Sequence, residues 1–103
     1  MCKLTGYEVK TEFWGLFIQA ERKGVDAIQK VFDMIWEKYR GNYIYLTELV
    51  LFLNWNIWYW DGAGSSYADE YATLYHKLFE KADQYALDTL KGKELSYFLR
   101  TVD

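Results

Sequence analysis

Residues 46–60 read LTELVLFLNWNIWYW and carry the strongest structural signal in the chain. At about 100° per residue, their apolar side chains form two stripes on opposite sides of a helix. The first stripe contains Leu46, Leu49, Val50, Leu53, Ile57 and Trp60. The second contains Leu51, Phe52, Trp55, Trp58 and Tyr59. A helix that is apolar nearly all round is normally enclosed by other helices or covered by a partner, so this stretch predicts a central helix.

The composition indicates a folded chain with a high aromatic content. Of its 103 residues, 51% are hydrophobic and 20% are aromatic. A chain of this length is expected to form one domain with its own core, in which aromatic burial supplies much of the stability. We therefore predict a single helical domain over residues 1–103.

The charge balance argues against binding to nucleic acid. Fifteen acidic and twelve basic residues give a net charge of −3, and no long run of Lys or Arg is present to contact phosphate groups. Stacking of bases on aromatic side chains also uses neighbouring basic residues, and residues 46–60 contain none. We expect no nucleic-acid partner.

The sequence favours a cytoplasmic protein. The single cysteine, Cys2, cannot form an internal disulfide, which fits a reducing compartment. The N-terminal residues lack the apolar run of a signal peptide. The central stretch is shorter than the roughly 20 residues of a membrane span and includes Glu48 and two asparagines, so we expect no membrane partner.

The N-terminal region has two competing interpretations. A short helix over residues 12–23, capped at Thr11, would place Phe13, Leu16, Phe17 and Ala20 on one face. Gly15 weakens this prediction, because glycine inside a helix costs about 1 kcal/mol relative to alanine. A strand over residues 7–18 is the alternative, but it would have no obvious partner strand.

The middle of the chain predicts two helices joined by a tight turn. Residues 25–39 have apolar side chains on one side and charged side chains on the other. Residues 40–42 are typical of a C-cap turn in which Gly41 adopts a positive φ. The central helix then begins between residues 43 and 47, with Thr47 followed by Glu48 as its capping pair.

The C-terminal part predicts the longest helix, over residues 67–90, and a final short one over residues 94–100. Residues 61–66 form the clearest loop, and Ser66 with Asp69 fits an N-cap followed by an acidic first turn. The apolar seam of the long helix consists of Tyr67, Tyr71, Leu74, Leu78, Ala82 and Tyr85. Short loops between long helices favour antiparallel neighbours. We therefore predict an all-α fold, a compact bundle of four to five helices around the central hydrophobic helix.

The charged side of the long helix holds the only histidine. Asp69, His76, Glu80 and Asp83 share one stripe at i, i+7, i+11 and i+14. A His and a Glu at i, i+4 can chelate a metal, but metal sites need further ligands, and this stripe has no second imidazole and no cysteine. We expect a solvated charged face and no metal site.

No residue pattern indicates catalysis. Cys2 lacks a nucleophile motif, and Glu48 is the only carboxylate of the central stretch. The loop at residues 61–66 lacks the glycine and lysine spacing of a phosphate-binding loop. We therefore expect a protein that is not an enzyme and uses no cofactor.

The aromatic surplus has a structural and a functional interpretation. The structural one is that the aromatic side chains fill the core. The functional one is that part of the second stripe stays exposed as an interface, because two full apolar stripes are hard to bury within one short chain. The candidate contact residues are Phe52, Trp55, Trp58 and Tyr59. They predict a protein partner or a homodimer.

Two segments resemble a known group of proteins. Residues 45–55, YLTELVLFLNW, and residues 90–103, LKGKELSYFLRTVD, are similar to the core and the ending of short uncharacterised proteins carried on mobile elements of gut bacteria. The resemblance implies no activity, cofactor or catalytic residue. It implies an accessory role in transfer of the element or in evasion of host defence.

These observations favour a small non-enzymatic protein-interaction module, and the resemblance adds the expectation of an accessory protein of a mobile element. The alternative is an acidic inhibitor of a nucleic-acid-binding host protein, which would act through Asp69, Glu80 and Asp83. A complex held by charge should weaken steeply as salt is added, whereas an aromatic interface should respond little.

Overall fold

The computed structural model describes residues 6–62 and 66–102, with side chains from residue 11 onward except at positions 66 and 67. Within these ranges the chain forms five α-helices and no strand, which confirms the all-α prediction. The helices are α1 (Gly6–Glu21), α2 (Val25–Tyr39), α3 (Tyr43–Asp61), α4 (Ser66–Thr89) and α5 (Lys93–Val102). The bounds of α2 agree with the predicted ones, and those of the other helices differ by a few residues.

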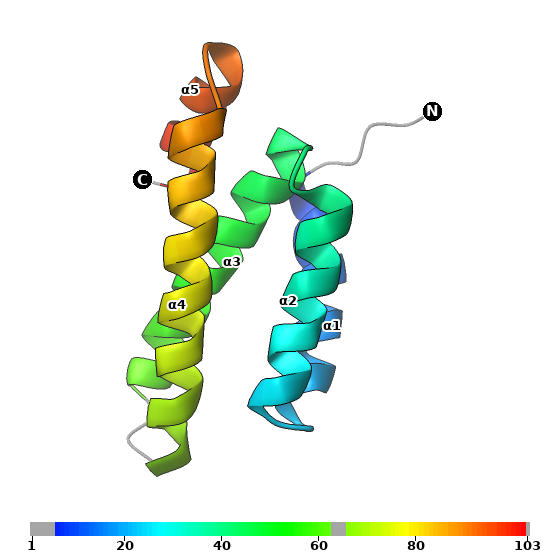
Figure 1. The fold of residues 1–103 in the computed structure, drawn as a ribbon, viewed down its shortest axis with the longest axis vertical. Helices are drawn as coiled ribbons and strands as arrows, with labels where there is room; N and C mark the ends of the chain where they lie inside the picture. Colours follow the sequence, from blue (N-terminus) through cyan, green and yellow to red (C-terminus); the bar gives the residue numbers. More distant parts are fainter. Residues whose placement is uncertain (1–5, 63–65, 103) are drawn as a thin grey trace.

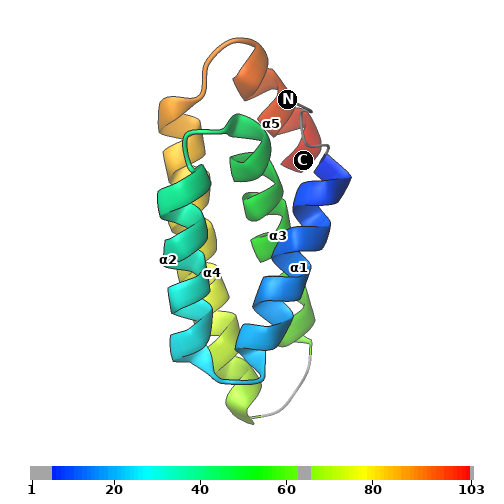
Figure 2. The same cartoon turned by 90° about the vertical axis from the view of Figure 1, so that its right-hand side faces the viewer.

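The four longer helices form two layers (Figures 1 and 2). One layer contains α1 and α3, and the other contains α2 and α4. Helix α1 packs on α2 and α3, and α4 packs on α3 and α2. The short helix α5 lies against α3 at the end of the bundle near the start of that helix (Figure 2). The largest interface joins α3 to α4, so α3 is the central helix of the predicted bundle.

The first apolar stripe of α3 is buried as predicted. Its buried members are Leu46, Leu49, Val50, Leu53 and Ile57, and Trp60 is half-buried. Aromatic side chains fill the space around the stripe, in agreement with the structural interpretation of the aromatic surplus. The buried aromatic residues are Phe13, Phe17, Phe32, Tyr45, Phe52, Tyr75 and Phe98.

The buried face of α4 is rotated around the helix relative to the predicted seam and carries smaller side chains. It consists of Ala68, Ala72, Tyr75, Leu78, Ala82 and Ala86, whereas Tyr71, Leu74 and Tyr85 of the predicted seam are half-buried. The predicted Tyr67 side chain lies outside the described residues. Alanine side chains let α4 approach α3 closely, and the bulky apolar residues of α3 then fill the interface. The centre of the contact therefore falls on small residues that a hydrophobic pattern underweights.

Helix α1 begins at Gly6, several residues before the predicted start. The predicted cap at Thr11 is therefore wrong, because Thr11 lies inside the helix, and the alternative strand is excluded. Gly15 also lies inside α1. Burial of Phe13 and Phe17 against the core outweighs the roughly 1 kcal/mol that glycine costs in a helix.

The predicted cap of α3 is also wrong. Asn42 caps the helix, because its Oδ1 accepts hydrogen bonds from the backbone N–H groups of Ile44 at 3.0 Å and Tyr45 at 3.4 Å. Thr47 is buried instead, and its hydroxyl donates to the carbonyl oxygen of Tyr43 at 2.6 Å. The helix thus begins one turn earlier than a Thr47 cap would place it.

Positive φ angles occur at two described glycines, Gly24 at 121° and Gly92 at 61°. The prediction of a positive φ at Gly41 is wrong. The turn there is closed by a hydrogen bond from the backbone N–H of Asn42 to the carbonyl oxygen of Tyr39 at 2.9 Å, with Arg40 in the right-handed helical region. The left-handed glycines instead follow α1 and α4, where they reverse the chain.

The predicted loop at residues 61–66 coincides only in part with the described residues. Residues 63–65 and the side chain of Ser66, the predicted N-cap, lie outside them. Asp69 occupies the first turn of α4 as predicted. None of the helices in the described ranges combines the length and the apolar content that crossing a membrane requires.

Candidate interaction surface

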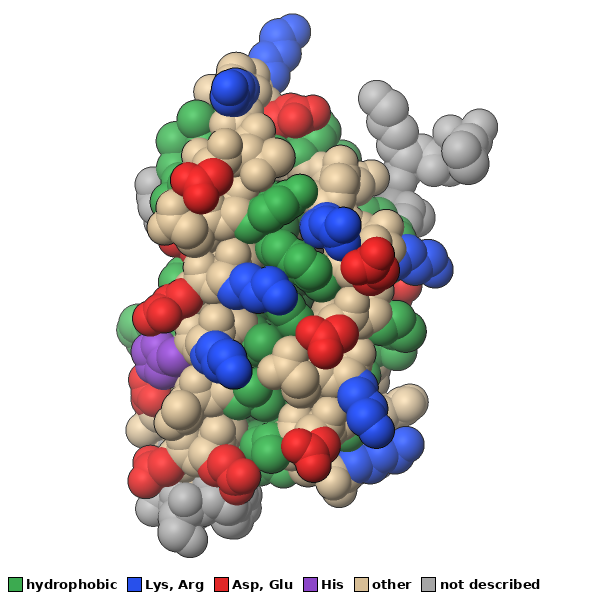
Figure 3. All heavy atoms as spheres, viewed as in Figure 1, with side chains coloured by type: hydrophobic (Ala, Val, Ile, Leu, Met, Phe, Trp, Pro, Cys, Tyr) green, Lys and Arg blue, Asp and Glu red, His purple; other side chains and the backbone are tan. Residues whose placement is uncertain are grey.

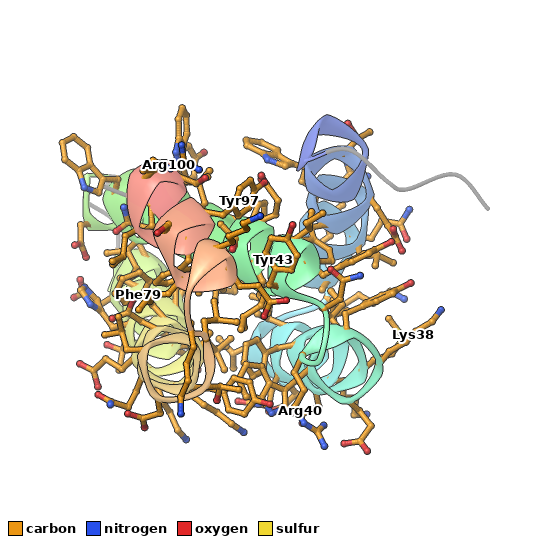
Figure 4. All side chains as sticks on the ribbon, turned by 90° about the horizontal axis from the view of Figure 1, so that it is seen from above. Lys38, Arg40, Tyr43, Phe79, Tyr97 and Arg100 are labelled. Carbon is orange, nitrogen blue, oxygen red and sulfur yellow. The ribbon has the colours of Figure 1, made fainter. Side chains whose placement is uncertain are left out.

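The environment of α3 changes along its length. From Tyr45 to Val50 every residue is buried, including the polar Thr47 and Glu48. Helix α5 covers this part, and the rings of Tyr43 and Tyr97 meet edge to face with centroids 5.3 Å apart (Figure 4). From residue 54 onward, the outer side of α3 faces solvent. The second apolar stripe is therefore covered at one end of the helix and open at the other.

Three predicted contact residues are exposed on consecutive turns of α3. The exposed fractions are 57% for Trp55, 78% for Trp58 and 66% for Tyr59. Large aromatic side chains are seldom this exposed unless they contact a partner. The expectation that the end of the second stripe stays uncovered therefore holds for these three residues.

Phe52, the fourth predicted contact residue, is only 4% exposed, so its predicted exposure is wrong. Its ring stacks on Phe17 of α1 with centroids 4.8 Å apart and meets the edge of Trp14 at 5.6 Å. Helix α1 crosses α3 at this point and covers the ring. Phe52 therefore lies beneath the exposed residues and packs against Trp14.

Helix α1 adds two exposed apolar residues that the sequence analysis did not single out, Trp14 at 39% and Ile18 at 40%. They are spaced i, i+4 and lie outside the predicted apolar face of the helix. The sequence signal that could have revealed them is the i, i+4 spacing of two large apolar residues outside that face. Together, Trp14, Ile18, Trp55, Trp58 and Tyr59 form what we call the aromatic surface.

A pocket of about 410 Å³ lies between α1 and α3, and we call it the α1–α3 groove. Its lining residues are Trp14, Ile18 and Glu21 of α1 and Phe52, Trp55, Asn56 and Tyr59 of α3. A second hollow, of about 320 Å³, is lined by Asn54, Trp55 and Trp58. Trp55 lines both hollows, so the aromatic surface is indented on either side of this residue.

Glu21 brings a carboxylate to the groove and is held there by α3 and α4. Its Oε1 accepts hydrogen bonds from the Tyr75 hydroxyl at 2.7 Å and from the Trp60 indole N–H at 3.4 Å. The Tyr71 hydroxyl donates to the backbone carbonyl of Glu21 at 2.9 Å. This cluster has no local sequence signal, because Glu21 and Tyr75 are 54 residues apart and only the packing of the helices brings them together.

Tyr75 is fully buried, which makes it a permanent hydrogen-bond donor. Burial is the main cause that raises the pKa of its phenol far above the ordinary value, and the Glu21 carboxylate raises this pKa further. The hydroxyl therefore keeps its proton over the whole range in which the protein is handled. Glu21 therefore accepts from a donor that stays protonated above the pH at which a free tyrosine ionises.

The predicted acidic face lies on α4, and its residues do not line the groove. Asp69 and Glu80 are exposed, and Asp83 is half-buried. His76 is exposed too, and its Nε2 lies 3.5 Å from Oδ2 of Asp61. The face formed by α2 and α4 carries blue and red side chains intermixed on both sides of an apolar line (Figure 3).

One basic residue on this face, Lys81, contacts aromatic rings of α2. The Nζ atom of Lys81 lies 5.4 Å from the ring centroid of Trp36 and 5.8 Å from that of Phe32. Trp36 in turn meets Tyr85 edge to face at 4.9 Å. An ammonium group above a tryptophan ring is a cation–π contact, and here it joins α4 to α2.

Groups of three or more His, Cys, Asp or Glu side chains placed to hold a metal ion do not occur within the described ranges. Cys2 lies outside those ranges. Among the described residues, the pocket between α1 and α3 brings part of the aromatic surface together with the carboxylate of Glu21.

Comparison of the chain with protein-family models, with curated proteins and with solved structures gives no match. The resemblance of residues 45–55 and 90–103 to mobile-element proteins stays a prediction. The aromatic surface and the α1–α3 groove are therefore the features from which a function can be inferred.

Proposed function

We propose that the chain is a non-enzymatic protein-interaction module that binds a different protein through the aromatic surface. The observation that carries this proposal is the exposure of Trp55, Trp58 and Tyr59 by more than half on neighbouring turns of one helix. Tryptophan and tyrosine dominate the energetics of protein interfaces, and monomers rarely expose such residues together.

The way α3 is held suits this role. The inner side of the same helix is anchored by Leu53 and Ile57, both buried in the core. The exposed rings are therefore presented on a fixed backbone, and binding needs to order only their side chains. Such preorganisation lowers the entropic cost of association.

The charge next to the aromatic surface favours a different protein over a second copy of the chain. Glu21 lines the groove, and α3 contains no basic residue. A symmetric contact between two copies uses the same patch twice, which would bring two Glu21 carboxylates to one interface. A partner with positively charged side chains has no such conflict.

The acidic-inhibitor alternative has less support. Along α4, the exposed Asp69 and Glu80 alternate with the exposed Lys77 and Lys81. Mimicry of a nucleic acid depends on a field of one sign over the surface. Mixed charges on this helix weaken such a field.

The experiment is an alanine scan of the complex formed with a partner captured from the native cell and then purified. Trp55→Ala and Trp58→Ala each remove one exposed ring, and Met34→Ala and Leu87→Ala are controls that remove exposed apolar side chains from α2 and α4. Titration calorimetry should show a loss in affinity on the order of 30-fold or more for the tryptophan variants and little change for the controls.

Three results would contradict the proposal. Equal losses in all four variants would mean that the surface is not specific. Concentration-dependent dimers of the isolated chain that dissociate in Trp58→Ala would identify a second copy as the occupant. Binding of the chain to neutral phosphatidylcholine vesicles, lost in the tryptophan variants, would assign the surface to a membrane.

A further inference from the structure

We infer that the α1–α3 groove is a site for a positively charged side chain, a lysine or arginine that the partner protein inserts. The inference rests on the proposed function, since the aromatic surface would dock the partner and the groove would receive its basic residue. It names the chemistry of the partner, which the exposed rings alone do not.

The lining of the groove suits an organic cation. Four of its seven lining residues are aromatic, namely Trp14, Phe52, Trp55 and Tyr59. The electron-rich faces of such rings attract ammonium and guanidinium groups, and tryptophan does so most strongly. The same chain already uses this contact at Lys81, whose ammonium group lies above the ring of Trp36.

Glu21 supplies the opposite charge. It is the only carboxylate among the lining residues, and its position at the end of α1 adds the negative end of the helix dipole. The bonds from Tyr75 and Trp60 both reach Oε1. An ionised carboxylate has acceptor sites on two oxygens, so it can still accept a hydrogen bond from a ligand.

Other ligand classes fit this lining less well. An anion would be repelled by Glu21 and by the end of α1. A neutral apolar group would remove water from the Glu21 carboxylate without supplying a counter-charge, which is costly. A lysine or arginine avoids both costs, because its aliphatic stem covers Ile18 and the rings while its charged end reaches Glu21.

A ligand can act as the counter-ion of the Glu21 carboxylate. Arg22 and Lys23 follow Glu21 and are exposed. In the part of the chain that the structure describes, Glu21 forms no ion pair with either of them or with another basic side chain. The groove volume of about 410 Å³ lies within the range of roughly 300–1,000 Å³ that is usual for ligand sites.

The test uses small probes in place of the partner. Nα-acetyl-lysine methylamide and Nα-acetyl-arginine methylamide present the two basic side chains, and Nα-acetyl-norleucine methylamide presents an apolar stem without charge. Binding to the full chain is followed by the NMR shifts of the tryptophan indole N–H groups. We expect Kd values on the order of millimolar for the cationic probes and at least about tenfold weaker binding of norleucine. The shifts should centre on Trp14 and Trp55.

Two variants and a control test whether Glu21 and the groove rings bind the charged end of the probes. Glu21→Gln should lower the affinity of the cationic probes to that of norleucine, whereas Glu12→Gln, which neutralises an exposed carboxylate on the same helix, should not. If Glu21→Gln does not fold, Trp55→Leu provides the test, because it removes an exposed ring and should weaken the cationic probes by about tenfold. Equal binding of all three probes, shifts centred elsewhere or no binding overturns the inference.

The outcomes separate this inference from the proposed function. If the partner needs Trp58 but Glu21→Gln binds it normally and the cationic probes do not bind, the groove inference fails and the interaction module stands. If the probes bind in the groove but the tryptophan variants bind the partner with unchanged affinity, the proposed function fails. In that case the groove remains a cation site for some other ligand.

Discussion

The two halves of α3 both carry many apolar residues, but they have different surroundings. In residues 43–53 the helix is enclosed by α1, α4 and α5, and even Thr47 and Glu48 are buried. In residues 54–61 only the inner side is covered, and three aromatic rings face solvent. The other helices therefore cover both sides of α3 over residues 43–53 but leave its outer side exposed over residues 54–61. The uncovered half exposes Trp55, Trp58 and Tyr59, and we propose that a partner covers these rings.

The largest loss of folding stability is expected at Leu53, which is fully buried at the boundary of the enclosed half of α3. Leu53→Ala should lower the free energy of unfolding by about 2–5 kcal/mol, because it removes buried apolar atoms and leaves a cavity. The exposed Glu80→Ala should change it by less than about 0.5 kcal/mol. Chemical denaturation measures both, and similar losses in the two variants would contradict the assignment of buried and exposed faces.

The exposed half should show the reverse pattern. Trp58 is 78% exposed, so Trp58→Ala should leave the free energy of unfolding within about 0.5 kcal/mol of the original value. The same substitution should weaken partner binding by about 2–4 kcal/mol if Trp58 is an interface anchor. Denaturation and calorimetry on one variant test both. A loss of folding stability larger than the loss of binding would mean that Trp58 belongs to the core.

The junction of α1 with α3 and α4 should respond to alkaline pH. Because the pKa of Tyr75 is raised in the folded state, the unfolded chain loses this proton first, at its ordinary pKa of about 10. Stability conferred by the protonated hydroxyl is thus complete below pH ~10 and falls above it, by at most about 1.4 kcal/mol per pH unit. Tyr75→Phe should remove this part of the slope. Burial also raises the pKa of Tyr97, so a smaller decline should remain.

A smaller effect is expected at the start of the enclosed half. Asn42→Ala removes the oxygen that accepts from Ile44 and Tyr45, so α3 loses its N-cap. The expected loss in the free energy of unfolding is about 1 kcal/mol. Asn42→Asp keeps an acceptor oxygen and should retain most of the stability. Equal losses in the two variants would show that the cap contributes little.

Helices with a strong hydrophobic pattern were predicted well from the sequence. The double stripe of residues 46–60 predicts a central helix, and the one-sided apolar pattern of residues 25–39 predicts α2 with its observed bounds. These segments are strongly periodic, so local pattern and tertiary packing agree. The early start of α1 was missed because residues 6–11 show no clear pattern, and helix formation there comes with the packing of the rest of α1.

The candidate site was harder to predict. The second stripe contains both Phe52 and Trp55, and nothing in its periodicity tells which residue α1 will cover. That outcome depends on where α1 crosses α3, which is a matter of tertiary packing. Glu21 could not be found from sequence at all, because its partners Tyr75 and Trp60 come from two other helices.

The most direct test of the proposed interface is a hydrogen-exchange and NMR footprint of the full chain bound to its purified partner. The side chains of Trp14, Trp55 and Trp58 should show the largest changes on binding, together with the backbone of residues 54–61. The exposed side chains of Asp69 and Glu80 on α4 should be unchanged. A footprint on α4 that leaves the three tryptophans unperturbed would contradict the assignment of the exposed half of α3 as the binding surface.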